Sequence, residues 1–260
     1  MSILDKIVAR KKEELALAKQ LVSVKQLEAA PNFNRTPLIF RDFLLDEKRT
    51  GIISEFKRRS PSKGLISGLA DVATVTQAYT AAGASALSVL TDTDFFGGTP
   101  DDLRNARTVN QIPILRKDFM IDEYQILEAK AWGADLILLI ASILTPKEIV
   151  AYGKFAQSLG LSVLLEVHDL AELERSICPN LDAIGVNNRN LADFTVNIQT
   201  SFDLVDKIPN EFLKISESAI DNPEVIKQLK AVGYNGFLIG ENFMKTEDPG
   251  KAIREFVTEL

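Results

Sequence analysis

Residues 52–64 read Ile52-Ile53-Ser54-Glu55-Phe56-Lys57-Arg58-Arg59-Ser60-Pro61-Ser62-Lys63-Gly64, an apolar entry that leads to charged residues and then to a basic, serine-rich turn. Residues two apart in a strand share a face, so Glu55 and Lys57 point the same way. In a parallel sheet both faces of a strand are buried, and a buried carboxylate beside a buried ammonium is costly unless the protein uses it. The turn offers donors and no acids, which suits a phosphate. The stretch therefore predicts a buried strand whose last residues, with the turn that follows, belong to a functional site.

The same plan of apolar run, polar end and following helix recurs along the rest of the chain. Strands are predicted at 52–56, 86–90, 113–116, 136–140, 162–165, 183–186, 213–215 and 236–239. Helices are predicted at 72–82, 100–109, 123–132, 146–159, 170–177, 200–207, 223–232 and 249–259. Alternating strands and helices imply a parallel sheet. Eight such units in this length favour a closed (β/α)8 TIM barrel over an open doubly wound sheet, and no Gly-x-Gly-x-x-Gly follows the first strand.

The first 50 residues precede this rhythm and are predicted to be an N-terminal helical extension, acting as a lid or a flank. A helix is expected over 2–20, begun by a capping box of Ser2 with Asp5. Residues 24–30 and 38–45 are expected to form shorter pieces. No linker-like stretch divides the chain, so we expect one domain over 1–260, with the extension at 1–50 and the barrel at 51–260.

Composition bounds the partners. The net charge is −6, from 30 basic and 36 acidic residues. This argues against nucleic acid as a binding partner, because the phosphate backbone binds basic surfaces. No apolar run reaches the ~20 residues that span a bilayer, and the N-terminus lacks the apolar core of a signal peptide. We therefore expect a cytoplasmic protein without a membrane partner, as a monomer or weak homo-oligomer.

Single cysteine and histidine residues restrict the chemistry. Cys178 is the one cysteine, so no intrachain disulfide is possible, and its setting predicts an ordinary helix-end residue. His168 is the one histidine, which excludes a multi-histidine zinc site and leaves a Ser-His-Asp triad only if His168 serves it. Neither a metal nor a cofactor is expected.

Polar residues follow the aliphatic runs at the strand ends, where barrels of this kind place their active sites. They are Glu55, Lys57, Lys117, Glu166, Asn187, Glu217, Ser218 and Gly240. A single polar residue there can simply meet solvent, but two lysines and three glutamates on one rim favour acid–base chemistry. Burial would lower the pKa of the lysines and raise that of the glutamates, while opposite charges would counter both shifts.

Phosphate and ring subsites are predicted on the same rim. Residues 216–220 and 238–242 match the loops after strands seven and eight, where barrels often hold phosphate, and Lys57 and Ser60 could close that site. Ordinary turn chemistry is the alternative for either loop. An aromatic patch is expected from Phe95, Phe96, Phe119 and Pro61, with a core role as its alternative.

These motifs together resemble the indole-3-glycerol-phosphate synthase family. Its first-strand signature is similar to residues 53–62, and the further matches are Leu90-Thr91-Asp92 with Phe96-Gly97-Gly98, Leu115-Arg116-Lys117-Asp118-Phe119, Leu165-Glu166-Val167-His168, Gly185-Val186-Asn187-Asn188-Arg189-Asn190-Leu191 and Ser216-Glu217-Ser218. The resemblance covers nearly the whole chain. It implies a cofactor-free lyase of tryptophan biosynthesis, acting on the phosphorylated small molecule 1-(2-carboxyphenylamino)-1-deoxyribulose 5-phosphate.

The resemblance also implies residue roles. Lys117 would be the general acid for the ribulose carbonyl, and Glu166 and Lys57 the acid–base pair of the later steps. The remaining catalytic residues would be Glu55, Asn187 and Glu217, and the substrate-binding residues Ser60, Pro61, Phe96, Phe119, Arg189, Leu191, Ser218, Gly240 and Glu241. Among these, Arg189 would meet the substrate carboxylate, while Ser60, Ser218, Gly240 and Glu241 would serve largely the phosphate.

Two positions depart from the family pattern. Ala219 stands where the family often has glycine, and alanine disfavours a left-handed backbone there. Glu241 stands where serine or threonine is also common, and we expect its carboxylate to turn away from a phosphate. Two other functions stay open at this level. One is another phosphate-binding barrel enzyme, such as a sugar-phosphate isomerase, and the other is a non-catalytic barrel that binds a phosphorylated ligand.

Overall fold

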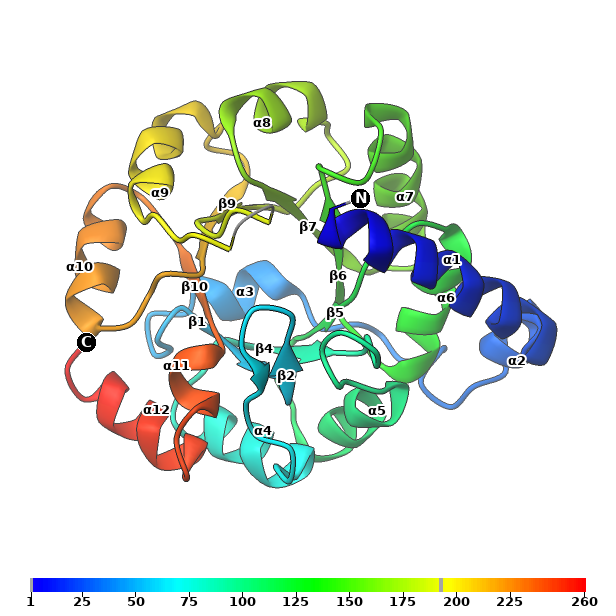
Figure 1. The fold of residues 1–260 in the computed structure, drawn as a ribbon, viewed down its shortest axis with the longest axis horizontal. Coiled ribbons are helices and arrows are strands. Elements are labelled where there is room, and N and C mark those ends of the chain that lie inside the picture. Colours follow the sequence, from blue (N-terminus) through cyan, green and yellow to red (C-terminus); the bar gives the residue numbers. More distant parts are fainter. Residues whose placement is uncertain (1, 192–193) are drawn as a thin grey trace.

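A closed barrel of eight parallel strands forms the centre of the computed structural model, which describes residues 2–191 and 194–260 (Figure 1). Neighbouring strands follow the order β1, β10, β9, β8, β7, β6, β5, β4 and back to β1, all in parallel. Their bounds are β1 Ile52–Phe56, β4 Ala86–Leu90, β5 Ile114–Lys117, β6 Leu136–Ile140, β7 Ser162–Val167, β8 Ala183–Asn187, β9 Leu213–Glu217 and β10 Gly236–Ile239. The predicted (β/α)8 TIM barrel is confirmed.

Helices surround the strands in Figure 1 and alternate with them along the chain. They are α4 Val72–Ala81, α5 Pro100–Val109, α6 Glu123–Trp132, α7 Pro146–Ser158, α8 Leu170–Ser176, α9 Gln199–Leu204 with the 3-10 turn η1 Val205–Lys207, α10 Pro223–Ala231 and α12 Pro249–Val257. Most begin at an Asp, Asn or Thr whose side chain accepts a hydrogen bond from a backbone N–H of the first turn. Such caps satisfy donors that the helix itself leaves open.

The bounds differ from the sequence prediction mainly at the strand ends. Strand β5 begins after Pro113, which has no N–H to give to a ladder. Strands β7, β8 and β9 run on to include polar residues, because backbone pairing continues past the last aliphatic side chain. Three short elements were not predicted. They are the strands β2 Arg59–Ser60 and β3 Gly64–Leu65, which form a hairpin, and the helix α11 Glu241–Met244.

Two apolar clusters form the core. One fills the barrel interior and includes Ile53, Leu115, Leu136, Leu164 and Ile215. The other lies between strands and helices and includes side chains such as Tyr79, Leu103 and Phe237. Burying each side chain of this size contributes about 1.5–3 kcal/mol, so the barrel is a packed frame that holds its strand ends in place.

The N-terminal extension contacts both ends of the barrel. It consists of α1 Ile3–Leu21, α2 Val24–Glu28 and α3 Phe40–Leu44, and the predicted capping box of Ser2 with Asp5 is present. In Figure 1, α1 crosses the side of the barrel that carries the β2–β3 hairpin and α11. Helix α3 closes the opposite end, where Leu44 packs against Gly236, the first residue of β10. In the described part of the chain, no helix has the length and apolarity that crossing a bilayer requires.

Candidate active site

A cavity of about 300 Å³ opens at the carboxyl ends of the barrel strands. Its lining includes all the catalytic and substrate-binding residues that the family resemblance implies, namely Glu55, Lys57, Ser60, Pro61, Phe96, Lys117, Phe119, Glu166, Asn187, Arg189, Leu191, Glu217, Ser218, Gly240 and Glu241. These residues come from strands and loops that are far apart in sequence. Barrel closure therefore brings them to one mouth.

The cavity floor is a layer of charged side chains from four alternate strands. Glu55 lies in β1, Lys117 ends β5, Glu166 lies in β7 and Glu217 ends β9. Alternate strands of a TIM barrel contribute to the same interior layer, which explains why these four meet. The Lys117 Nζ lies 2.8 Å from Glu166 Oε2 and 3.2 Å from Glu217 Oε2.

Charge neighbours decide the protonation of this layer. Burial would lower the pKa of Lys117, but Glu166, Glu217 and Glu55 together raise it above its usual range. Burial would raise the pKa of Glu166, but Lys117 and His168 hold it well below its usual range. Burial raises the pKa of Glu217 to about 7, only partly offset by Lys117. The layer thus holds a stable ammonium, a stable carboxylate and one carboxyl group that titrates near neutrality.

Two glycines make room for the buried carboxylates. A Cβ atom at Gly185 in β8 would collide with Glu217 Oε1, and one at Gly240 would collide with the side chain of Glu55. Glu55 Oε1 in turn accepts the Lys57 ammonium at 2.8 Å. The pair predicted to share one face of the first strand is therefore in direct contact.

Asn187 links the charged floor to the loop after β9. Its Nδ2 donates to Glu166 Oε1 at 3.1 Å, and its Oδ1 accepts from Ser218 Oγ at 2.9 Å and from the Arg189 N–H at 3.0 Å. Ser218 and Ala219 both have left-handed backbones, with φ of 65° and 57°. The left-handed backbone that Ala219 put in doubt at the sequence level is therefore present.

The neighbouring Asn188 holds that loop, since its Nδ2 donates to the carbonyl oxygens of Glu217 at 2.9 Å and Ser218 at 3.3 Å. A left-handed alanine costs about 1–2 kcal/mol, which these contacts offset.

Cations surround Glu241 at the rim. Its carboxylate lies 3.4 Å from Arg189 NH2 and 3.7 Å from Lys63 Nζ. The side chain still lines the cavity, but it faces two positive groups that reduce its repulsion of an anion.

Aromatic rings form one wall of the cavity. The centroids of Phe96 and Phe119 lie 5.9 Å apart, and both residues line the cavity with Pro61. Phe95 does not line it and packs against the interior apolar cluster. The expected aromatic patch is thus present without Phe95.

His168 joins the charged layer, a contact that the sequence reasoning did not assign. Its Nε2 lies 3.4 Å from Glu166 Oε1, and its Nδ1 lies 3.1 Å from Glu172 Oε2. Burial alone would lower the pKa of His168, but the neighbouring carboxylates of Glu166 and Glu172 raise it to about 10. The signal was available, because His168 stands two residues after Glu166 and so shares its face.

Helix α1 also lines the cavity, through Ile3, Leu4 and Ile7. An apolar helix stripe predicts burial but not which surface covers it, so the sequence left open whether this extension is a lid or a flank. Among the described residues, no cluster of His, Cys, Asp or Glu side chains is arranged to hold a metal ion.

Solved structures share the fold at low sequence identity. A chain described as the native KDPGal structure has a TM-score of 0.57 at 13% identity, covering 81% of this chain and 92% of that one. A mandelate oxidase variant with benzoyl-formic acid has a TM-score of 0.59 at 13% identity, covering 80% of this chain and 70% of that one. At this identity the likeness shows the barrel alone.

Sequence relatives go further. The chain is 46% identical over 258 residues to the indole-3-glycerol phosphate synthase of Bacteroides thetaiotaomicron, covering 99% of this chain and 98% of the relative. It is 41% identical over 259 residues to the enzyme of the same name from a Polaromonas species, covering 97% of each. The family model of indole-3-glycerol phosphate synthase matches residues 4–256. The chain therefore belongs to the indole-3-glycerol phosphate synthase family.

Proposed function

We propose that this chain is a carboxy-lyase that converts 1-(2-carboxyphenylamino)-1-deoxyribulose 5-phosphate to indole-3-glycerol phosphate in tryptophan biosynthesis. One observation carries the proposed mechanism: the Lys117 ammonium stands in the cavity between Glu166 at 2.8 Å and Glu217 at 3.2 Å. This is a proton donor set among carboxylates, with an aromatic wall and a cationic rim beside it.

Ring closure is the step that most needs the acid. The aryl carbon that bears the carboxylate forms a bond to the ribulose carbonyl carbon, and Lys117 gives its proton to the carbonyl oxygen. Positive charge then develops on the anilino nitrogen and the ring. The carboxylates of Glu166 and Glu55 lie in the same layer and stabilise it.

The later steps restore aromaticity. The bond to the carboxylate carbon breaks, carbon dioxide leaves, and the electron pair returns to the ring. The new hydroxyl group then leaves as water with a proton from an acid, while a base takes a proton from the neighbouring carbon. Glu166 and Lys57 are the proposed acid–base pair for this dehydration, with Asn187 orienting Glu166 at 3.1 Å.

Binding contacts follow from the lining. The aromatic ring of the substrate would pack on Phe96 and Phe119, with Pro61 and Leu191 completing that wall. Arg189 would meet the carboxylate of the substrate. Its phosphate would lie against the loops that carry Ser60, Ser218, Gly240 and Glu241. In one of these loops, the left-handed Ser218 and Ala219 turn the backbone.

The test is Lys117→Ala. We expect turnover, followed by the fluorescence of the indole product, to fall below detection while substrate still binds in a titration, because the acid is lost and the wall is kept. Lys19→Ala is the matched control, since Lys19 forms an ion pair with Asp122 on the surface at 2.8 Å. Unchanged turnover in Lys117→Ala would discard the mechanism.

Assays with the carboxyphenylamino substrate and with phosphoribosyl anthranilate distinguish the proposed function from the two alternatives. A wild-type chain that isomerises phosphoribosyl anthranilate without forming indole product would be a sugar-phosphate isomerase. A chain that binds the carboxyphenylamino substrate and converts neither compound would be a binding barrel.

A further inference from the structure

Lys11 of α1 lies outside the cavity lining, yet it is only 4% exposed. We propose that Lys11 is a positioning residue, whose ammonium fixes the two loop segments that carry Phe96 and Phe119 and thereby sets the aromatic wall for the substrate ring. This inference rests on the proposed function, and it assigns part of the work of that site to the N-terminal helix.

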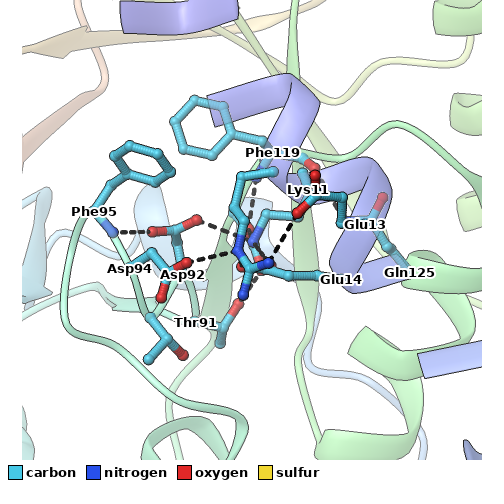
Figure 2. Close-up of polar contacts among 12 residues, drawn as sticks. Lys11, Glu13, Glu14, Thr91, Asp92, Asp94, Phe95, Phe119 and Gln125 are labelled. Carbon is cyan, nitrogen blue, oxygen red and sulfur yellow. Dashed lines mark hydrogen bonds and ion pairs between the residues drawn. The ribbon is translucent and has the colours of Figure 1, made fainter. Parts of the chain in front are cut away.

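Lys11 is held by three carboxylates. Its Nζ lies 3.0 Å from Asp92 Oδ2 and 2.7 Å from Glu14 Oε2 (Figure 2). The same Nζ lies 3.0 Å from Asp118 Oδ1. Burial would lower the pKa of Lys11, but Asp118, Asp92 and Glu14 raise it above its usual range. The side chain is therefore a fixed cation between the helix and two loops of the barrel.

Asp92 uses its other oxygen to shape the loop after β4. Asp92 Oδ1 accepts the backbone N–H of Phe95 at 2.9 Å and that of Phe96 at 3.2 Å. The Asp92 carbonyl accepts the N–H of Gly98 at 2.8 Å. The loop thus folds around one carboxylate, and the orientation of that carboxylate decides where Phe96 lies.

Asp118 does the same for the segment after β5. It stands between Lys117 and Phe119, and its Oδ1 accepts the N–H of Phe119 at 2.8 Å. Its Oδ2 accepts from Thr91 Oγ1 at 2.6 Å and from Arg116 NH2 at 3.1 Å. Lys11 therefore bridges the two carboxylates that hold the two rings of the Phe96–Phe119 pair.

The position of Lys11 on α1 adds a second link to the cavity. The buried residues of α1 are Ile7 and Lys11, one helical turn apart, and Ile7 lines the cavity. A buried ion pair of this kind is weak evidence for stability alone, since apolar residues often replace one without loss. Here the contacts of Lys11 with Asp92 and Asp118 instead fix the position of α1 relative to the two loops.

Arg10 gives a matched contrast on the same helix and the same loop. Its Nε lies 2.6 Å from Asp94 Oδ2, and both side chains are 46% exposed. This pair also joins α1 to the loop after β4. However, neither residue lines the cavity, and their hydrogen bond does not involve the backbone of Phe96 or Phe119.

The first measurement is steady-state turnover of Lys11→Met and Arg10→Gln. For Lys11→Met we expect KM to rise about tenfold and kcat to change less than about threefold, because a displaced wall weakens ground-state binding. For Arg10→Gln we expect changes below about twofold. An unchanged KM in folded Lys11→Met would overturn the inference.

A double-mutant cycle with Phe96→Ala separates positioning from general stability. If Lys11 acts through the ring, Phe96→Ala costs less in kcat/KM in the Lys11→Met background than in the wild type, by about threefold or more. The cycle with Arg10→Gln should be additive. Additive effects in both cycles would mean that Lys11 supports the fold only.

Asp118→Asn serves if Lys11→Met does not fold. Asparagine keeps an acceptor for the Phe119 N–H but weakens the ion pair, so we expect KM to rise about threefold. Unaltered kinetics in Asp118→Asn would count against the inference.

Calorimetric titration with indole-3-glycerol phosphate measures the same wall without turnover, and we expect its Kd to rise about tenfold in Lys11→Met. A wild-type chain that binds this product but makes none would sink the proposed function and leave this inference standing. If the wild type turns over substrate normally and Lys11→Met leaves the Kd unchanged, the inference on Lys11 is overturned and the proposed function stands.

Discussion

Glu217 is a buried residue whose protonation changes near neutral pH. Burial raises its pKa to about 7, so between the ordinary glutamate pKa and this value the folded chain holds a proton that the unfolded chain releases. Stability therefore falls as pH rises through that window, by up to about 1.4 kcal/mol per pH unit from this group. We expect Glu217→Gln to remove this slope and to gain stability relative to the wild type from pH 5 to pH 8.

Urea unfolding at several pH values measures the slope. Glu174→Gln, at an exposed position, should keep the wild-type pH dependence. A Glu217→Gln variant with the same slope as the wild type would show that another group titrates there.

At the scale of elements, the start of α5 joins a helix to the loop after β1. Thr99 and Asp102 form a capping box, and the Asp102 carboxylate also accepts Arg58 at 2.6 and 2.8 Å while only 5% exposed. We expect Asp102→Ala to lower the free energy of unfolding by about 2–4 kcal/mol, because the cap is lost and Arg58 is left unpaired.

Denaturant unfolding gives this difference directly. Asp101→Ala is the comparison, because Asp101 is 77% exposed and pairs with Arg104 on the surface, and it should cost less than about 1 kcal/mol. Equal losses in the two variants would mean that the buried contacts of Asp102 contribute nothing special.

At the scale of the whole molecule, the sequence predicted what depends on local pattern. The apolar runs predicted the strands, and the polar residues at their ends predicted the charged layer. The alternation of strands and helices along the chain predicted that the strands are parallel. The β2–β3 hairpin was not predicted because it is held by only two residue pairs. The left-handed Ala219 and the placement of α1 depend on contacts with distant residues, which no local pattern contains.

The two ends of the barrel divide stability from binding. Phe40 of α3 and Ile7 of α1 belong to the same interior cluster, but α3 packs at the amino end of the barrel while Ile7 lines the cavity. We expect Phe40→Ala to lower the free energy of unfolding by about 3–5 kcal/mol, with KM within about twofold of the wild type. Ile7→Ala also opens a void, but because that void adjoins the substrate we expect KM to rise about fivefold. Parallel urea unfolding and turnover assays compare the two, and a KM that rises equally in both would show that the barrel transmits strain from one end to the other.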